Sequence, residues 1–359
     1  MSEPPSSRGQ ALWQGLARPG VLLWVLLGLV PVMLAVLYMD AYGQPSPYTD
    51  DWVHGVNLAI EVKEGTLGWD DFTRTYNGHR LIFTNLHIVA FAALTEWDLR
   101  AEMWINPLLI GLNLVLLLIL LAGEDRRLAF LAWVPFSALG YMLYQELNLL
   151  VGHQSSWHFV LTFWLAALVT LRYGQVSVAR LALAAFWLVC GVFSFGTGPV
   201  LLPMFPVVAW SLGYRRSAYI VAAVLVCVGA GVLYLADTEI AVEDSGAGSD
   251  FETIALDAVS LPKLGNFTLT FLGNPFSYQD AEVARMVAVL GVLLLVVNGY
   301  ALWRGGWLRA RAWLWLGLVG YSGRGRCAQP DWRAWTCLTR TGPRSSCATA
   351  RQPFRSGGC

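Results

Sequence analysis

GVLLWVLLGLVPVMLAVLYM, residues 20–39, is an uninterrupted apolar run without a charged side chain. A helix needs about 20 such residues to cross the roughly 30 Å hydrocarbon core of a bilayer. The run is also too long for the apolar region of a secretory signal. Of the 359 residues, 56% are hydrophobic and only 13% are charged. This composition indicates a polytopic membrane protein and excludes a soluble domain. The zero net charge gives no reason to expect nucleic acid as a partner.

Further apolar runs predict an all-α transmembrane helical bundle with about eight or nine spans. Two long loops, residues 40–103 and 237–284, interrupt otherwise short connections. We expect an N-terminal segment at 1–19, a transmembrane domain at 20–321 and a tail at 322–359. The additional spans are expected near 104–122, 128–145, 158–172, 181–196, 198–213, 218–236 and 286–303, with a fragment that starts at 312.

The apolar segment LIFTNLHIVAFAALT, residues 81–95, is too short to span, because its helix would extend only about 22 Å. If it does not span, all the short basic loops lie on the same side as the N-terminal segment, as the positive-inside rule requires. We therefore predict a helix in the outer interface, or a re-entrant helix, that carries Asn85 and His87. The arginines behind this assignment are Arg8, Arg18, Arg126, Arg127, Arg172, Arg180, Arg215, Arg216, Arg304, Arg309 and Arg311. The same topology places the N-terminus in the cytoplasm and both long loops, with most of the 24 acidic residues, outside.

The adjacent acids Asp50 and Asp51, in SPYTDDWVHG, open the first long loop, and His54 close behind them is a candidate substrate-binding residue. Neighbouring carboxylates raise one another's proton affinity, so one of them can serve as a base near neutral pH. Together they can also hold a divalent cation, Mg or Mn, through hard oxygen ligands. The structural alternative is that one of the two only caps the helix-like stretch that follows.

Later in the same loop, GWDDFTRTYNGHRLIF brings a second acid pair and then His79 and Arg80. A guanidinium at the membrane boundary suits a bidentate phosphate contact, and His79 can donate a second hydrogen bond. Alternatively, Arg80 only anchors the next helix among lipid headgroups. In the second long loop, Lys263 is a further candidate for binding phosphate.

The outer turn YQELNLLVGHQSSWHF contains several hydrogen-bonding side chains, of which His153 and Gln154 are candidate substrate-binding residues. No spacing among the five His residues matches a zinc motif such as HExxH. The pattern therefore predicts a polar cavity and no structural metal.

A first span followed by a long outer loop with YTDDWVHG, an interfacial helix and many further spans resembles the GT-C superfamily of membrane glycosyltransferases. These enzymes include protein mannosyltransferases and the aminoarabinose transferases of lipid A. The resemblance in layout covers residues 20 to about 320. In motif it rests on Asp50 and Asp51, which match the family's Asp-Asp/Glu pair, and on NGHR and NLLVGHQSSW, which resemble signatures of bacterial relatives.

The resemblance implies transfer of a sugar from a polyprenyl-phosphate donor to a cell-envelope acceptor, on the outer face of a bacterial plasma membrane. It gives Asp51 the role of base or metal-linked acid and Asp50 the role of its partner. Arg80, His79 and Lys263 would bind phosphate. A lipid-linked donor and membrane lipids are the implied partners; the sequence does not predict an oligomeric state.

Two other functional classes fit the same layout. A transporter or flippase of lipid-linked saccharides also needs several spans around a polar cavity, although transporters usually place ionisable groups at mid-membrane. A non-catalytic membrane protein of envelope assembly could keep the same architecture without activity.

The tail has a different composition from the rest of the chain. After residue 321 it is rich in Arg, Gly, Pro, Ser and Thr, and four of the six Cys lie there. Two interpretations remain open. One is a disordered basic cytoplasmic tail with free thiols. The other is a slipped reading frame, which would explain why the apolar run beginning at 312 stops halfway across a membrane.

Overall fold

The computed structural model describes residues 19–76, 79–236 and 280–304, with a few residues between 265 and 273. The predictions for residues 1–18, for Lys263 and most of the loop 237–284, and for the tail 322–359 lie outside these ranges.

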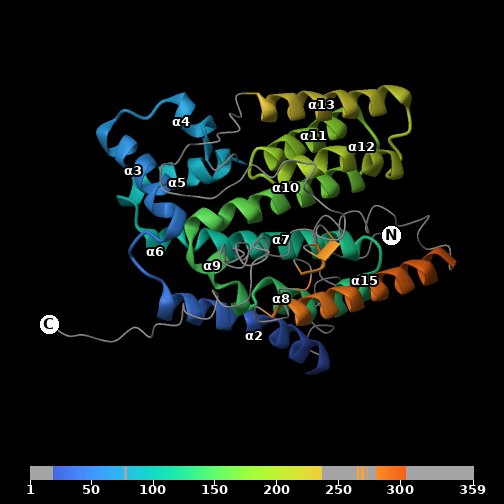
Figure 1. The fold of residues 1–359 in the computed structure, drawn as a ribbon. Helices are drawn as coiled ribbons and strands as arrows, with labels where there is room; N and C mark the ends of the chain where they lie inside the picture. The colour runs from blue at the N-terminus through green and yellow to red at the C-terminus, as the bar shows by residue number, and fades with distance from the viewer. Residues whose placement is uncertain are drawn as a thin grey trace, which may run out of the picture.

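The chain folds as a bundle of α-helices, as the sequence predicts (Figure 1). Within the described ranges, every apolar run predicted to span coincides with a helix. These long helices are α2 (Pro19–Tyr42), α7 (Ile105–Ala122), α8 (Arg126–Gly140), α10 (Ser155–Arg172), α11 (Val178–Val192), α12 (Leu201–Ser211), α13 (Ser217–Leu235) and α15 (Ala281–Arg304).

Shorter elements fill the first long loop and the outer turns. A helix is present at the segment 81–95, as predicted: it is α5, whose first residue donates a 3.1 Å hydrogen bond from the Ile82 N–H to the carbonyl of Phe193. The antiparallel strands β1 and β2 pair Thr75 with Arg80 and Tyr76 with His79. The short elements are η1 (Thr49–Trp52), α3 (His54–Glu64), α4 (Trp69–Thr73), β1 (Thr75–Tyr76), β2 (His79–Arg80), α5 (Ile82–Thr95), α6 (Leu99–Glu102), η2 (Leu143–Gln145), α9 (Glu146–Leu150), η3 (Gly152–Gln154) and η4 (Gly198–Val200).

Fewer helices meet the length and hydropathy expected of a membrane span than the sequence predicts. In the described part of the chain three do: Pro19–Tyr42, Leu99–Ala122 and Ser217–Leu235. The bent pair Arg126–Gly140 and Leu143–Leu150, with 40° between its halves, would make a fourth. The expected eight or nine spans are therefore not confirmed, because several of the other apolar helices are too short to cross a hydrocarbon core alone. The chain nonetheless has the long apolar helices of an integral membrane protein.

The main core lies where α10 packs between α7 and α11; α12 and α13 pack against α11 (Figure 1). Trp164 on α10 is its largest fully buried side chain. Small residues let the helix backbones approach closely around it, as is common where membrane helices meet. The small buried residues are Ala167, Ala184, Ala185, Ala209 and Ala223.

Two buried polar side chains hold α7 to α10. The Thr162 hydroxyl donates a 2.8 Å hydrogen bond to Oδ1 of Asn113, and the Asn113 amide donates in turn to the carbonyl of His158 at 3.3 Å. Such interhelical bonds stabilise helix pairs in membranes by about 0.6 to 2 kcal/mol. They fix the register of α10, whose first turns carry the residues of the candidate site.

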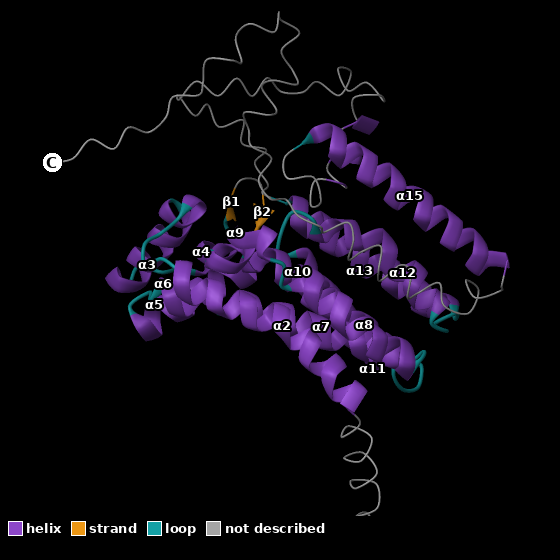
Figure 2. Cartoon of the chain, turned by 90° about the horizontal axis from the view of Figure 1, so that it is seen from below, coloured by secondary structure: helices purple, strands orange, loops and turns teal. Residues whose placement is uncertain are grey.

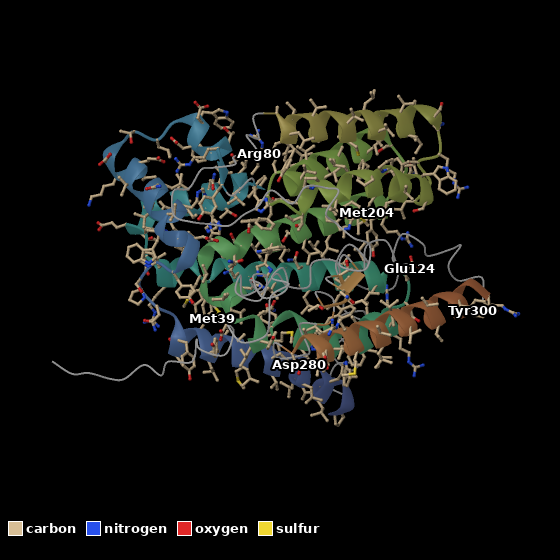
Figure 3. The ribbon with its side chains drawn as sticks, viewed as in Figure 1. Met39, Arg80, Glu124, Met204, Asp280 and Tyr300 are labelled. Atoms are coloured by element: carbon tan, nitrogen blue, oxygen red, sulfur yellow. The ribbon has the colours of Figure 1, made fainter. Side chains whose placement is uncertain are left out.

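The two ends of the bundle differ in charge. The turns that join α7 to α8, α10 to α11 and α12 to α13 lie at one end, and arginines lie in them or within the first or last turn of the flanking helices (Figure 1). At this end Arg172 forms an ion pair of 2.9 Å with Glu124, which ties two of the turns together. Figure 3 shows Glu124 and Tyr300 toward this end and Arg80 toward the other. The small elements of the first long loop gather at the opposite end (Figure 2).

Helix α2 meets α8 at a glycine. A Cβ atom added at Gly28 would lie 1.9 Å from Nε1 of Trp133, so only glycine allows this approach. Because the two helices lie close together, two hydrogen bonds join them. The Ser137 hydroxyl donates to the Gly28 carbonyl at 2.5 Å, and the Trp133 indole donates to the Val25 carbonyl at 3.1 Å.

We predict that Gly28→Ala lowers the thermal stability of the detergent-solubilised protein, by about 1–3 kcal/mol, because Trp133 must move and the hydrogen bonds of α8 to α2 weaken. Gly229→Ala is the matched control, since a Cβ at Gly229 on α13 meets nothing within 4 Å. Equal stability of the two variants would show that the Gly28 contact does not hold α2 to α8.

Candidate functional site

Buried polar side chains collect at the end of the bundle where α3, α5, α6 and η3 meet. In so apolar a chain each of them needs a partner, because an unsatisfied polar group in a dry interior costs about 1–3 kcal/mol. We call the following seven residues, each less than 10% exposed, the polar cluster: Asp51, His54, Asn85, His87, Glu102, His153 and Ser155.

Asp51 is the least compensated member of the polar cluster. Its side chain is 3% exposed. One carboxylate oxygen accepts a 3.4 Å hydrogen bond from the backbone N–H of Tyr48, so Asp51 helps to cap the short helix η1. The other oxygen, Oδ1, is buried without a hydrogen-bond partner among the described residues. The structural alternative of a capping role therefore accounts for one oxygen and leaves the second available.

The surroundings of Asp51 favour its protonated form. Burial raises the pKa of Asp51 to about 7, and the nearby carboxylates of Glu102 and Asp50 add to this effect. The backbone N–H of Tyr48, which is bonded to the carboxylate, acts in the opposite direction, because it stabilises the charged form. The backbone N–H of His153 adds to this from nearby, without the geometry of a hydrogen bond to Oδ1. Asp51 thus exchanges its proton near neutral pH, as a general base requires.

Asp50 faces a different partner. Its Oδ1 accepts a 3.2 Å hydrogen bond from the hydroxyl of Tyr76 on β1, and its side chain is only partly buried. The two neighbouring carboxylates therefore turn to different groups.

In the described part of the chain, no three His, Cys, Asp or Glu side chains are grouped to hold a metal ion. A divalent cation at this pair, as the sequence predicts, would need further ligands.

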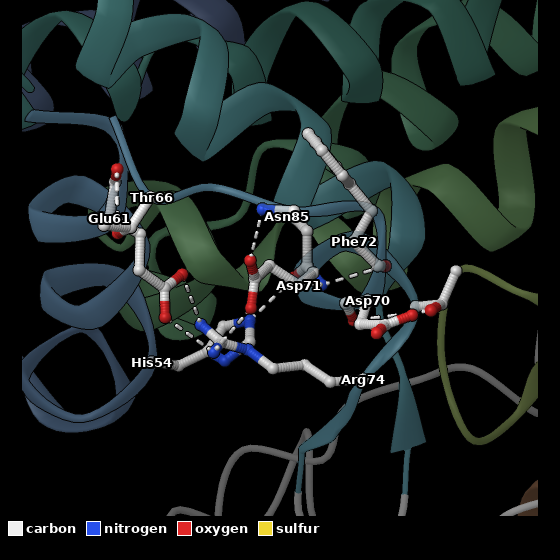
Figure 4. Close-up of polar contacts among 10 residues, drawn as sticks. His54, Glu61, Thr66, Asp70, Asp71, Phe72, Arg74 and Asn85 are labelled. Carbon is white, nitrogen blue, oxygen red and sulfur yellow. Dashed lines mark hydrogen bonds and ion pairs between the residues drawn. The ribbon is translucent and has the colours of Figure 1, made fainter. Parts of the chain in front are cut away.

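His54 is held in one tautomer. The Asn85 amide donates at 3.2 Å to the backbone carbonyls of both Asp71 and Phe72, so its Oδ1 must face His54 (Figure 4). His54 Nε2 therefore carries the proton and donates to Asn85 Oδ1 at 2.7 Å. Burial lowers the pKa of His54 below its usual value, which keeps the ring neutral.

His153 packs edge-on against two other rings. Its ring centroid lies 5.3 Å from that of His54 and 5.6 Å from that of Tyr76. Its Nδ1 atom is buried and makes no hydrogen bond among the described residues. Burial, with the two nearby histidines, lowers the pKa of His153 to about 3. A neutral imidazole and an unpaired carboxylate oxygen thus belong to adjoining short helices, η3 and η1.

A second part of the polar cluster was not predicted as a site. His87 Nε2 lies 2.9 Å from Glu102 Oε1, and His87 Nδ1 lies 3.2 Å from the hydroxyl of Ser155. Sequence reasoning noted His87 only as part of an interfacial helix and did not consider Glu102 or Ser155. The available signal was an acid, Glu102, directly before a long apolar span, a position where a charge is costly unless it is paired.

The sequence-predicted phosphate ligands lie at the edge of the polar cluster. The Arg80 guanidinium donates to three backbone carbonyls: those of Thr73 at 3.0 Å, Tyr234 at 3.1 Å and Ala236. It therefore caps the C-terminal end of α13 from a buried position, which differs both from a free phosphate ligand and from the predicted anchor among lipid headgroups. The His79 ring packs against that of Phe195 at a tilt of 52°, with centroids 4.7 Å apart.

The structure brings together some of the predicted site residues and leaves others apart. His54 and His153 are in ring contact, and Asp51 lies close to His153. Gln154 ends η3 and is partly buried. Lys263 lies outside the described residues.

The second acid pair serves the local structure. Asp71 accepts a 2.7 Å hydrogen bond from the N–H of Gly68 and lies 3.3 Å from Arg74, which also binds Glu61 at 2.9 Å (Figure 4). Asp70 is exposed. This pair therefore folds the loop back on α3 and provides a matched control for the first pair.

A groove at the opposite, basic end of the bundle has a different character. It lies between α10 and α11, and its lining is mostly apolar with a single basic side chain, Arg180. Its lining contains no acid or histidine, in contrast to the polar cluster. The lining residues are Val169, Thr170, Tyr173, Ala179, Arg180 and Leu183.

The sequence matches no protein-family model, and neither the curated proteins nor the solved structures give a match. The functional proposal therefore rests on the fold, the geometry of the polar cluster and the resemblance stated from the sequence.

The raised pKa of Asp51 makes the protein's stability depend on pH. The native state holds this proton more tightly than the unfolded chain, whose Asp titrates near 3.9, so the free energy of unfolding falls as pH rises from about 4 to about 7. We predict that Asp51→Asn removes this loss and is more stable than the wild type at pH 8, by up to about 4 kcal/mol, but not at pH 4. Thermal unfolding in detergent across this pH range measures the difference.

Asp70→Asn is the control for this measurement and should follow the wild-type pH dependence, because Asp70 is exposed. If Asp51→Asn and the wild type lose the same stability between pH 4 and pH 8, Asp51 does not titrate near neutral pH.

Proposed function

We propose that this chain is a membrane glycosyltransferase that moves a sugar from a polyprenyl-phosphate donor to a hydroxyl group of a cell-envelope acceptor. The observation that carries the proposal is Asp51, a buried carboxyl group with a pKa of about 7 and one oxygen without a hydrogen-bond partner among the described residues. It stands in the first loop after the first span, where the resemblance to the GT-C enzymes expects the catalytic acid. A buried carboxyl group poised near neutral pH is characteristic of functional sites.

The chemistry requires one base and a good leaving group. The Asp51 carboxylate takes the proton of the acceptor hydroxyl while the hydroxyl oxygen bonds to the anomeric carbon of the sugar. The bond from that carbon to the phosphate oxygen breaks, and the lipid phosphate departs with the electron pair. Asp50, fixed by Tyr76, adds negative charge beside the oxocarbenium-like transition state.

His79 and Arg80 are the phosphate ligands in this proposal, with Lys263 as a third. Arg80 is already bonded to three carbonyls, so binding phosphate would require it to exchange at least one of them. His79, on β2, is only partly buried and packs against the turn that carries Phe195 and Gly196, so it is the more accessible of the two.

The charge distribution supports an outward-facing site. The arginine-bearing turns lie at one end of the bundle and the polar cluster at the other. With the arginines on the cytoplasmic side, as the positive-inside rule favours, the polar cluster faces outward. This is the side on which the GT-C enzymes, which this chain resembles, use polyprenyl-phosphate sugars as donors.

A transporter or flippase is the alternative with some support. The buried chain of Glu102, His87 and Ser155 contains exchangeable protons, as proton-coupled transporters do. The polar cluster lies at the end of the bundle, in the short helices of the first loop and the outer turn, and this position favours surface chemistry over translocation. A non-catalytic envelope-assembly protein gives no reason for an unpaired buried carboxylate.

We predict that the purified protein transfers radiolabelled sugar from one member of a panel of polyprenyl-phosphate hexoses and pentoses, in a detergent extract that contains envelope acceptors. Asp51→Asn should lower the rate by at least about 100-fold, because an amide cannot accept the proton. The wild-type rate should rise with pH up to about pH 7 as Asp51 ionises.

Asp70→Asn is the matched control and should keep the wild-type rate. Full activity of Asp51→Asn would remove Asp51 from the mechanism. If the wild type transfers no sugar from any donor but moves a fluorescent polyprenyl-phosphate lipid across vesicle membranes, the transporter alternative replaces the enzyme. Retained transfer in EDTA would rule out the divalent cation.

A further inference from the structure

The groove between α10 and α11 lies at the basic end of the bundle, away from the polar cluster. Val169 on α10 and Leu183 on α11 give it apolar sides, and Leu183 is 47% exposed. Residues 179, 183 and 186 share one face of α11 by helical spacing, and Phe186 is 55% exposed. An exposed apolar surface therefore continues from the groove along the bundle, as expected of a surface that contacts lipid chains.

Arg180 is the charged residue of the groove. Its Nη1 donates a 3.2 Å hydrogen bond to the carbonyl of Thr170, which holds the side chain across to α10. Among the ion pairs of the described residues Arg180 takes no part, whereas Arg172, in the last turn of α10, binds Glu124 at 2.9 Å. A guanidinium has five N–H donors. Most of those of Arg180 therefore remain for an anion.

A glycine turn sets the position of this guanidinium. Gly174 has a φ of 98°, in the left-handed region that favours glycine. A Cβ added there would lie 2.0 Å from Nη2 and 2.8 Å from Nε of Arg180. The guanidinium thus lies against the backbone of the turn from α10 to α11, and a larger residue at 174 would displace it.

The end of the bundle around the groove is positively charged. The three turns and the adjoining helix turns contain six arginines but only two acids, Glu124 and Asp125. Both acids already have partners, because Glu124 pairs with Arg172 and Asp125 accepts from two N–H groups at the start of α8. The surplus of positive charge favours an anionic occupant over a neutral one. The arginines are Arg126, Arg127, Arg172, Arg180, Arg215 and Arg216.

We propose that this groove binds an anionic phospholipid, with an acyl chain between α10 and α11 and the headgroup phosphate on Arg180. The phosphate accepts hydrogen bonds from the guanidinium N–H groups that Thr170 does not use, and a guanidinium matches two phosphate oxygens at once. A phosphate ion alone would leave the apolar sides of the groove without a partner. A phospholipid accounts for both the charge and the apolar lining.

The position of the groove fits a lipid of the cytoplasmic leaflet. With the arginines on the cytoplasmic side, as the positive-inside rule favours, Arg180 lies near the headgroups of that leaflet. Anionic lipids give this leaflet a negative surface potential, and basic pockets between helices on this side bind anionic headgroups. The polar cluster lies at the other end of the bundle. The lipid site therefore goes beyond the proposed sugar transfer and does not depend on it.

Binding of phosphatidylglycerol to the purified, detergent-solubilised protein tests the proposal. Native mass spectrometry measures its affinity against that of phosphatidylcholine with the same acyl chains, without any sugar donor. We expect phosphatidylglycerol to bind the wild type more tightly and Arg180→Gln to weaken its binding by about tenfold, because a charge-assisted hydrogen bond is lost. Arg215→Gln is the matched control: it removes the same charge from an exposed position outside the groove and should keep the wild-type affinity.

Ala179→Trp tests the acyl-chain part and does not need Arg180→Gln to fold. Ala179 is an exposed residue of the lining, so an indole there fills the groove without entering the core. It should weaken phosphatidylglycerol binding by about tenfold at unchanged charge. Val178→Trp adds the same side chain at the next position, outside the lining, and should bind as the wild type does.

Four results would overturn the lipid site. Equal affinity for the two lipids, or an equal loss in Arg180→Gln and Arg215→Gln, would mean that Arg180 does not select the headgroup. Wild-type affinity in folded Arg180→Gln would remove the phosphate contact. Wild-type affinity in Ala179→Trp, with displacement of the lipid by inorganic phosphate, would leave a phosphate site without an acyl chain. None of these results bears on sugar transfer, which is measured separately.

Discussion

The buried hydrogen bonds of Glu102 to His87 and Trp97 are the interaction on which the candidate site depends. An ionised carboxylate with no exposure can persist in a helical bundle this apolar only if its lone pairs are satisfied. Meeting that requirement brings α5 against α6, sets the strained turn at Trp97 and leaves room only for glycine at position 152. The remaining members of the polar cluster lie on the elements that this arrangement brings together.

Glu102 and Asp51, the two acids of the polar cluster, differ in how their carboxyl oxygens are bonded. Both are acids with almost no exposure, yet Glu102 has both oxygens bonded by side chains and Asp51 keeps one oxygen unpaired. Two carboxyl groups with such different surroundings take different roles: one is held in place by its hydrogen bonds, and the other exchanges a proton. Neutral His54 and His153 add no positive charge that would cancel this difference.

The apolar part of the bundle positions the elements that carry the polar cluster. Gly28 lets α2 reach α8, and Asn113 with Thr162 fixes α10 against α7. Because α10 begins with Ser155, its register determines where the Ser155 hydroxyl meets His87. Small residues and a few interhelical hydrogen bonds thus set the geometry of polar groups that lie far along the chain from one another.

The sequence by itself determined the helical class, the position of each described long helix and the short helix at 82–95, because hydropathy and charge are local properties of the chain. It also singled out Asp51, His54 and His153. Only the tertiary structure decided that Asp51 and Asp50 turn to different partners, that Arg80 caps α13, and that Glu102 and Ser155 meet at His87. Those contacts join residues separated by long stretches of sequence, such as Arg80 and Tyr234. Their formation depends on which helices pack together, and neither spacing nor composition carries that information.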